Sequence, residues 1–179
     1  MKNLTTVLVL TVVFAITSLT SANAQFQREV KKIEKHVIIT AFENDNLSNH
    51  LPSFCAYFDK DYYRFNLDKT SFGSIGTEAT VYEVRDNEKM TLREMFTKID
   101  ANLNNSVMTQ AQIYKFRKAH FDLLADSGYP TYFLTADSEN ELFVICIKTS
   151  TSGTSLFVYP IDFGFEYSED FHYRVVYPN

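Results

Sequence analysis

Residues 142–147 have the sequence Leu-Phe-Val-Ile-Cys-Ile (LFVICI), and this stretch decides the fold. Side chains alternate between the two faces of a β-strand, so a run without polar residues predicts a strand that is apolar on both faces. Such strands are typical of the middle of a sheet that is covered on both sides. We therefore expect residues 142–148 to form a central strand.

Three further segments with strand character surround this one. Short polar or acidic loops separate them, as in neighbouring antiparallel strands. The segments are residues 131–135, 155–161 and 171–177. Together with residues 142–148 they predict a C-terminal antiparallel β-meander.

The middle of the chain predicts two helices, each beginning at a capping box. Thr91 is followed three residues later by Glu94, and Thr109 by Gln112. In this spacing each of the two side chains bonds the backbone amide of the other residue. Apolar residues recur at helical spacing after both boxes. We expect the second helix to continue toward Gly128, where the chain gives a stop signal.

The segments before the helices are predicted to be mostly strands. Residues 36–42 are β-branched and residues 77–84 alternate, whereas residues 25–35 are charged and indicate a frayed tail or a short helix. Residues 54–58 and 62–67 flank a three-residue turn and predict a hairpin.

The predicted fold class is α+β, with N-terminal strands, two central helices and a C-terminal antiparallel β-meander. We expect the helices to cover one face of the sheet. No linker, internal repeat or low-complexity tract divides residues 25–179, which predicts a single globular domain.

The C-terminal part resembles a recurrent module of uncharacterised proteins from candidate-phyla bacteria. The shared order is a TQ-x-QI helix with an F-x-x-x-H step, a G-Y-x-T-F-F-L strand, an F-F-V strand and a final R-V-V-x-P. Residues 109–134, 142–144 and 174–178 carry the resemblance, which covers roughly the last 70 residues. Tyr132 replaces a Phe of the module, and the Trp residues that such modules often carry are missing. The resemblance implies the order of helix and strands, and it implies no activity.

The first 24 residues have the order of a cleavable secretory signal peptide. Lys2 gives a basic start, residues 7–16 (VLVLTVVFAI) are apolar, and residues 18–24 (SLTSANA) are small and polar. The apolar run is shorter than the roughly 20 residues that span a bilayer. A retained anchor helix is the alternative. We expect cleavage after Ala24, a secreted or periplasmic location and no stable membrane insertion of the mature chain.

Charge and composition exclude several partners. The net charge of −5 and the lack of a basic run argue against nucleic-acid binding. Aromatic content is high, with 16 Phe and 11 Tyr, but the absence of Trp argues against a sugar-binding platform. No GxSxG pattern supports a common hydrolase, and no P-loop or GxGxxG pattern supports nucleotide binding. We predict no cofactor.

The two cysteines, Cys55 and Cys146, allow two interpretations. An even pair in an exported protein predicts one disulfide. Alternatively, both are small buried hydrophobic residues, because each lies in an apolar strand pattern.

Two arrangements are candidates for catalysis. Cys55 with a histidine would suit acyl transfer, although no local signature surrounds the cysteine. An acidic cluster before the last strand would suit a general acid and base, although an acidic, solvated loop or a partner-facing rim is the favoured explanation. The candidate histidines are His36, His50 and His120, and the acidic residues are Asp162, Glu166, Glu169 and Asp170. His120 on an apolar helix face favours packing over catalysis.

One segment imitates the start of a calcium-binding loop. Asp100, Asn102 and Asn104 supply oxygens at alternate positions between two predicted helices. Asn105 replaces the glycine of the sharp turn and Ala111 replaces the bidentate glutamate. An Asn-rich turn that caps helices is therefore the favoured interpretation, and we predict no metal site. The histidines show no metal-ligand spacing.

The sequence favours an exported, non-catalytic binding module over the alternative, a small secreted hydrolase. Aromatic side chains dominate the energetics of protein interfaces, so exposed Tyr and Phe are the candidate contacts to a protein or cell-envelope component. The predicted binding residues are Tyr57, Tyr62, Tyr63, Phe163, Phe165 and Tyr167.

Overall fold

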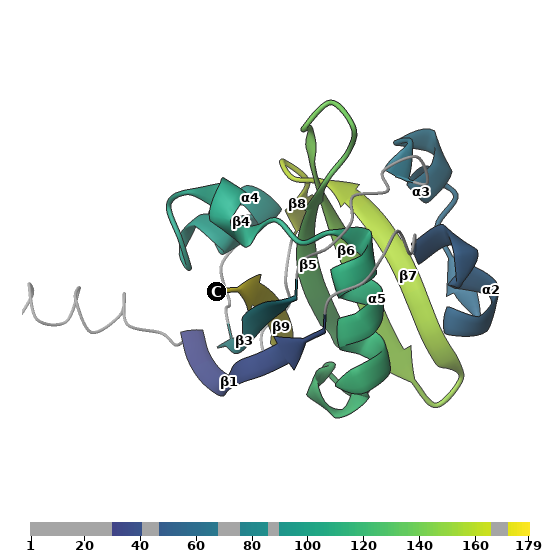
Figure 1. Cartoon of the computed structure of the whole chain (residues 1–179), viewed down its shortest axis with the longest axis horizontal. Helices are drawn as coiled ribbons and strands as arrows, with labels where there is room; N and C mark the ends of the chain where they lie inside the picture. The colour runs from purple at the N-terminus through teal and green to yellow at the C-terminus, as the bar shows by residue number, and fades with distance from the viewer. Residues whose placement is uncertain (1–29, 41–46, 68–75, 86–89, 166–171) are drawn as a thin grey trace, which may run out of the picture.

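The computed structural model describes residues 30–40, 47–67, 76–85, 90–165 and 172–179. This part of the chain contains a seven-stranded sheet, a separate two-stranded sheet and short helices (Figure 1). The strands are β1 (Val30–Ile39), β2 (Tyr57–Phe58), β3 (Thr77–Arg85), β4 (Met90–Thr91), β5 (Pro130–Ala136), β6 (Leu142–Ser150), β7 (Gly153–Pro160), β8 (Gly164–Phe165) and β9 (His172–Pro178). The α-helices are α2 (Leu51–Phe54), α3 (Asp61–Arg64), α4 (Leu92–Thr97) and α5 (Gln110–Ala119), and the 3-10 helices are η1 (Leu47–Asn49), η3 (Leu103–Ser106) and η4 (Phe121–Leu123).

The large sheet has the strand order β1-β3-β9-β5-β6-β7-β2. Its neighbouring strands are antiparallel, except that β9 runs parallel to β5 and β2 runs parallel to β7. The small sheet pairs β4 with β8. A large sheet combined with helices agrees with the predicted α+β class.

The prediction for β6 as a central, covered strand is confirmed. It lies between β5 and β7, and its residues Phe143 to Ile147 are all buried. Phe143, Ile145 and Ile147 belong to one hydrophobic cluster, whereas Val144 and Cys146 belong to another. Because consecutive side chains of a strand point to opposite faces, the two clusters lie on opposite faces of the sheet.

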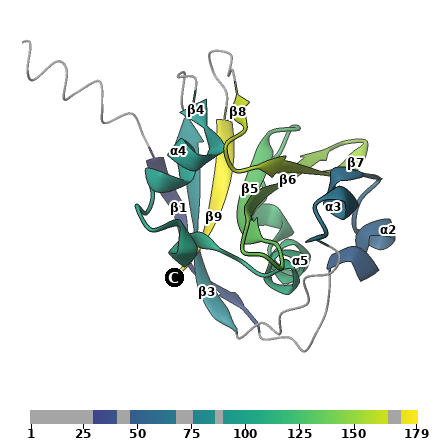
Figure 2. The ribbon, with the colours of Figure 1, turned by 90° about the horizontal axis from the view of Figure 1, so that it is seen from above.

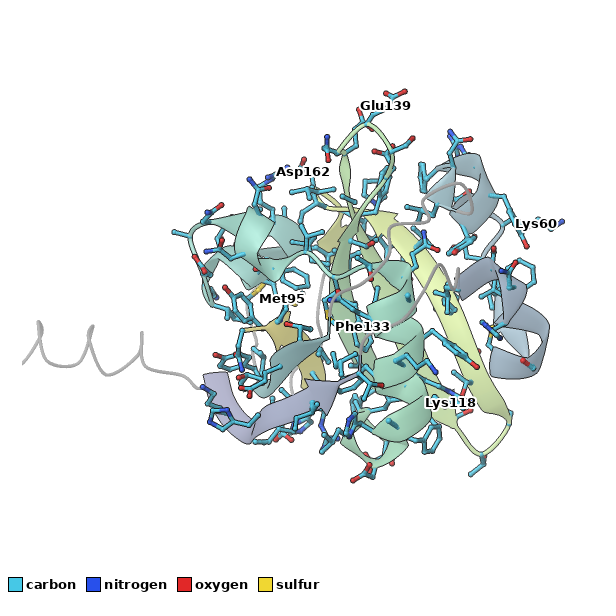
Figure 3. All side chains as sticks on the ribbon, in the orientation of Figure 1. Lys60, Met95, Lys118, Phe133, Glu139 and Asp162 are labelled. Atoms are coloured by element: carbon cyan, nitrogen blue, oxygen red, sulfur yellow. The ribbon has the colours of Figure 1, made fainter. Side chains whose placement is uncertain are left out.

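Each face of the sheet is covered by a different helix. Ile113 and Phe116 of α5 belong to the first cluster, and Met95 and Phe96 of α4 belong to the second. We call these sides the α5 face and the α4 face; Figure 3 shows Met95 beside α4 and, by α5, Phe133 of the first cluster. The prediction that the helices cover one face is therefore wrong. A strand that is apolar on both sides needs a cover on both sides.

Both predicted capping boxes are present. In α4 the Thr91 amide donates to Glu94 Oε2 at 2.7 Å, and the Glu94 amide donates to Thr91 Oγ1 at 3.2 Å. In α5 the Thr109 amide donates to Gln112 Oε1 at 2.8 Å, and the return bond measures 3.2 Å. The helix α5 ends earlier than predicted, because His120 has a non-helical φ of −131° and η4 follows it.

The predicted C-terminal meander is correct for β5, β6 and β7 and wrong for β9. Instead of extending the meander, β9 returns to the other side of β5 and inserts between β5 and β3. Its residues Val175 and Val176 are buried in the clusters of opposite faces. A strand in the interior of a sheet is covered on both faces, so a strand with apolar residues on both faces, as β9 has, fits this position.

The predicted hairpin around residues 59–61 is wrong, because two short helices flank β2 instead. Pro52 lies in the first turn of α2, where its missing N–H costs nothing. Asp59 precedes α3, and its carboxylate accepts a hydrogen bond from the Asp61 amide at 3.1 Å. The buried Tyr62 of α3 donates its hydroxyl hydrogen to Gln110 Oε1, so α3 is tied to α5. In Figures 1 and 2, α2 and α3 lie together beside β7.

The expectation of a tail or helix before residue 36 is wrong from Val30 onward, since residues 30–35 belong to β1. This strand lies at the edge of the sheet and has two register shifts against β3. His36 lies within the second shift, between Glu34 and Val37, and adopts a positive φ of 61°. Lysines and bulges are common at sheet edges, where they hinder pairing with other chains. Residues 25–29 and the predicted signal peptide lie outside the described residues.

Candidate functional site

Two of the predicted binding residues are exposed on the same face of the sheet. Tyr57 of β2 is 52% exposed, and Phe163, which follows β7, is 43% exposed. Between them lie Phe157 and Tyr159 of β7, both partly buried against the α4-face cluster. We call Tyr57, Phe157, Tyr159 and Phe163 the aromatic strip.

The rings of the aromatic strip form one continuous run. The ring centroids of Tyr57 and Phe157 are 5.4 Å apart, those of Phe157 and Tyr159 are 6.4 Å apart, and those of Tyr159 and Phe163 are 5.0 Å apart. The last two pairs are stacked, with interplanar angles of 14° and 29°. Aromatic pairs at these separations stabilise one another beyond the area they bury. The strip is therefore a preformed surface.

Strand geometry explains how the four rings come together. Phe157 and Tyr159 are two positions apart in β7, so their side chains point to the same face. Tyr57 pairs in parallel with Ser155, which places its side chain on that face beside Phe157. Phe163 follows after the chain turns, and its amide donates to the Pro160 carbonyl at 3.0 Å.

The stacking decides which parts of the rings can meet a ligand. A flat group inserted between two rings needs about 7 Å, twice the roughly 3.5 Å of an optimal carbon contact. The spacings of 6.4 Å and 5.0 Å are shorter than this. A ligand therefore meets the outside of the strip rather than the space between two neighbouring rings.

Charged groups stand at both ends of the aromatic strip. At one end Lys148 Nζ lies 5.5 Å from the centroid of the Phe157 ring, a cation–π contact. At the other end Asp162, next to Phe163, forms two hydrogen bonds with the Arg93 guanidinium, at 2.6 and 3.0 Å. These bonds hold the pKa of the Asp162 carboxyl below its ordinary value. The apolar strip thus has a polar rim, as protein interfaces have.

Of the other predicted binding residues, the structure describes the side chains of Tyr62 and Tyr63. Tyr62 is fully buried, so its prediction as a surface contact is wrong: its ring belongs to the core and its hydroxyl bonds to Gln110. Tyr63 is 46% exposed but contacts the rings of Phe58 and Tyr62, on the α5 side. Phe165 lies in β8, and its side chain is outside the described part of the structure. Tyr167 lies outside the described residues altogether.

The predicted disulfide is absent, because both cysteines are free thiols. Cys146 points into the α4-face cluster, whereas Cys55 packs against the α5-face cluster, so the sheet separates them. The alternative interpretation therefore applies to Cys146, which is fully buried and whose pKa burial raises to about 12.

Cys55 lacks the properties of an activated nucleophile. Its thiol donates to the Leu51 carbonyl at 3.4 Å, and burial raises its pKa, an effect that the nearby Arg117 guanidinium partly offsets. A reactive cysteine needs the opposite shift, because the thiolate is the nucleophile.

The three candidate histidines make contacts of a structural kind. His36 Nδ1 lies 2.9 Å from Glu78 Oε2 on the neighbouring strand. The ring of His50 stacks on Tyr114, with the centroids 4.1 Å apart. His120 Nε2 lies 3.1 Å from the Ile38 carbonyl oxygen, which joins the end of α5 to β1.

The structure describes one member of the proposed catalytic acid cluster. Asp162 is held ionised by Arg93, so it is a poor general acid. The other members, Glu166, Glu169 and Asp170, lie outside the described residues.

The segment that resembles a calcium loop forms a hydrogen-bonded turn. Asp100 accepts bonds from the Asn102 amide at 2.8 Å, from the Asn105 side chain at 3.0 Å and from the Tyr177 hydroxyl at 2.5 Å. Asn102 Oδ1 accepts the Asn104 amide at 3.3 Å. The side-chain oxygens of Asp100 and Asn102 thus cap a turn, and the Tyr177 hydroxyl joins this turn to β9. Within the described ranges, no group of three His, Cys, Asp or Glu side chains is placed to hold a metal ion.

Comparison with known proteins gives no match to a family model, to a curated protein or to a solved structure. None of the helices in the described part of the chain is both long and apolar enough to cross a bilayer. Function is therefore inferred from the geometry of the aromatic strip.

Proposed function

We propose that this protein is an exported, non-catalytic binding module that recognises a protein or cell-envelope component through the aromatic strip. One observation carries the proposal. Four aromatic rings form a continuous run on the α4 face, and its end members Tyr57 and Phe163 are 52% and 43% exposed. Exposed aromatic clusters of this kind are typical of binding sites rather than of inert surface.

The form of the strip supports a protein partner over a glycan. The chain has no Trp, the residue that sugar-binding platforms usually present. Lys148 at one end and the Arg93–Asp162 pair at the other supply polar contacts at the rim. An aromatic centre with a charged rim matches the anatomy of protein interfaces.

The test is retention of partners by wild-type protein and by two variants. The strip variant carries Tyr57→Ser, Tyr159→Ser and Phe163→Ser. The control variant carries Tyr63→Ser, because Tyr63 is exposed to a similar extent but lies on the α5 side. The mature proteins are immobilised and exposed to exported and envelope fractions of the organism that makes them. Circular dichroism and thermal unfolding establish that each variant is folded.

We expect a component that the wild type and the control variant retain and the strip variant loses. Equal retention by all three proteins contradicts the role of the strip. Loss with the Tyr63→Ser variant alone moves the binding surface to the α5 side. Export is tested separately, by the mass of the secreted protein, which we expect to begin at Gln25.

A further inference from the structure

The polar rim of the aromatic strip differs in charge between its two ends. At the Phe163 end, the Arg93 guanidinium and the Asp162 carboxylate form two hydrogen bonds, so their charges balance each other. At the Phe157 end, Lys148 carries a positive charge. None of the ion pairs among the described residues includes Lys148. The strip therefore has one cationic end and one neutral end.

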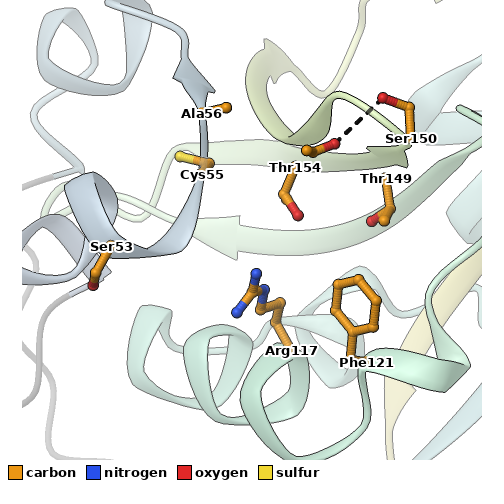
Figure 4. Close-up of a pocket in the computed structure, with 9 residues that line it drawn as sticks. Ser53, Cys55, Ala56, Arg117, Phe121, Thr149, Ser150 and Thr154 are labelled. Carbon is orange, nitrogen blue, oxygen red and sulfur yellow. Dashed lines mark hydrogen bonds between the residues drawn. The ribbon is translucent and has the colours of Figure 1, made fainter.

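Strand geometry places Lys148 on the same face as the strip. Its cross-strand partner in β7 is Ser155, two positions before Phe157. The next residue, Thr149, lines a pocket of about 350 Å³ on the α5 face, which Arg117 lines as well (Figure 4). Because consecutive side chains of a strand point to opposite faces, Lys148 belongs to the α4 face. A ligand on the strip can therefore reach its ammonium group.

The surroundings of Lys148 hold the side chain without neutralising it. The residues opposite Lys148 on the neighbouring strands, Pro130 and Ser155, carry no charge. The side chain is partly buried, and Nζ lies 5.5 Å from the centroid of the Phe157 ring. A cation–π contact of this kind positions an ammonium group and leaves its charge in place. In a chain with a net charge of −5, Lys148 is thus a local attraction for an acidic group.

The strip also has the spacing of an extended polypeptide. The ring centroids of Phe157 and Tyr159 are 6.4 Å apart. Side chains on one face of an extended segment repeat every second residue, which is about 6.6 Å at the usual rise per residue. An extended partner segment that lies along β7 therefore places one side chain beside each ring in turn.

We propose that the strip binds an extended segment of a partner protein that carries a carboxylate at one end and apolar side chains at alternate positions. The carboxylate, of an aspartate or a glutamate, pairs with the Lys148 ammonium, and the apolar side chains pack along the aromatic rings. The ion pair sets the direction of the segment, because the Arg93–Asp162 end is neutral. This proposal rests on the function proposed for the strip and names the chemistry of its partner.

The test measures the binding of synthetic peptides to the full mature chain by fluorescence anisotropy. The acidic probe has the sequence Asp-Ser-Phe-Ser-Leu-Ser-Phe with blocked ends and an uncharged coumarin label. A second acidic probe has the reverse order, so that both chain directions are sampled. In two matched neutral probes, Asn replaces Asp. The proteins are the wild type, Lys148→Gln, Lys148→Arg, the strip variant and Lys118→Gln, which removes the same charge from the α5 helix.

We expect the wild type to bind at least one acidic probe about threefold to fivefold more tightly than its neutral counterpart at low salt, as a partly exposed ion pair allows. Lys148→Gln should lose this preference and keep its affinity for the neutral probe. Lys148→Arg and Lys118→Gln should retain the preference. Added sodium chloride should reduce it, since salt screens the pair. The strip variant should bind neither probe.

Three results overturn the proposal. They are equal affinities of the wild type for the acidic and neutral probes, an acid preference that folded Lys148→Gln retains, and failure of every probe to bind. Binding of both probes without an acid preference, lost in the strip variant, rejects the carboxylate but keeps the strip as a binding surface. The partner-retention test of the strip therefore fails or succeeds separately.

The same proteins distinguish a protein segment from a lipid surface. Vesicles of phosphatidylglycerol carry negative charge, whereas vesicles of phosphatidylcholine are neutral overall. We expect the wild type and Lys148→Gln to sediment equally little with both kinds of vesicle. Sedimentation with phosphatidylglycerol vesicles alone, lost in Lys148→Gln, would overturn the protein segment in favour of a lipid headgroup.

Discussion

The same strands form both faces of the sheet, but the two faces differ in how other elements of the chain cover them. On the α5 face, Phe143 and Leu156 lie in a cluster that α5 and the segment from Leu47 to Leu67 also enter. On the α4 face, α4 packs against the middle of the sheet, while Tyr57 and Phe163 beside β7 keep half their surface in solvent. The comparison teaches that the covered region provides stability, and that the continuous run of partly exposed rings on the α4 face is where the proposed partner is to be sought.

The largest expected effect distinguishes a buried phenylalanine of one face from an exposed one of the other. Phe116 of α5 is fully buried, and its ring centroid lies 5.4 Å from that of Phe133. Phe116→Ala should lower the free energy of unfolding by about 3–5 kcal/mol through lost burial and a cavity. Phe163→Ala should lower it by less than about 1 kcal/mol. Urea denaturation measures both; equal losses would remove the distinction between the faces.

A smaller effect tests the hydrogen bond between Tyr62 and Gln110 on the α5 face. Tyr62→Phe keeps the ring and removes the hydrogen donor to the buried Gln110 amide. We expect a loss of about 1–3 kcal/mol, because a buried acceptor loses its partner. Tyr63→Phe is the matched control and should change the stability little, since Tyr63 is 46% exposed. If Tyr62→Phe leaves the free energy of unfolding unchanged, the hydrogen bond to Gln110 does not stabilise the fold.

The smallest effect concerns the hydrogen bond from the Tyr177 hydroxyl to Asp100 at the edge of the α4 face. Burial, and then the bond to Asp100, raise the pKa of Tyr177 from 10.0 to about 12. The stability that this shift supplies is complete below pH 10 and is lost as the pH rises through 12. The melting temperature of the wild type should therefore fall more steeply than that of Tyr177→Phe between pH 10 and 12.

The same hydrogen bond shifts the pKa of its acceptor, Asp100, in the opposite direction, so it also affects stability in acid. Hydrogen bonds from Tyr177 and Asn105 lower the pKa of Asp100 below its ordinary 3.8. Its contribution is present above that value and is lost as the pH falls through the lowered pKa. Tyr177→Phe should thus also flatten the acid limb of the stability profile. If the stability of the wild type and of Tyr177→Phe changes in parallel in both acid and alkali, the hydrogen bond between Tyr177 and Asp100 does not stabilise the fold.

The elements that sequence predicted best are those with local signals. The apolar run of β6 and the reciprocal side chains of Thr91 and Thr109 required no knowledge of distant residues. The short helices α2 and α3 were missed because their aromatic residues also favour strands. Their helical form depends on tertiary contacts such as the bond from Tyr62 to Gln110. The position of β9 between β3 and β5 was missed for the same reason, because strand order is not a local property.

The candidate site could be predicted in part. Tyr57 and Phe163 were expected to be exposed aromatics, and they are. Phe157 and Tyr159 were missed, although one signal was present: β7 alternates aliphatic and aromatic side chains, and the aliphatic ones point to the closed face.

The most direct test of the central claim is hydroxyl-radical footprinting of the protein before and after it binds the retained partner. Tyr57, Tyr159 and Phe163 should become protected. Tyr63 and Phe121, which are 46% and 48% exposed and lie away from the strip, should stay as reactive as before. Protection of Tyr63 or Phe121 with the strip unchanged would contradict the account and place the binding surface on the α5 side.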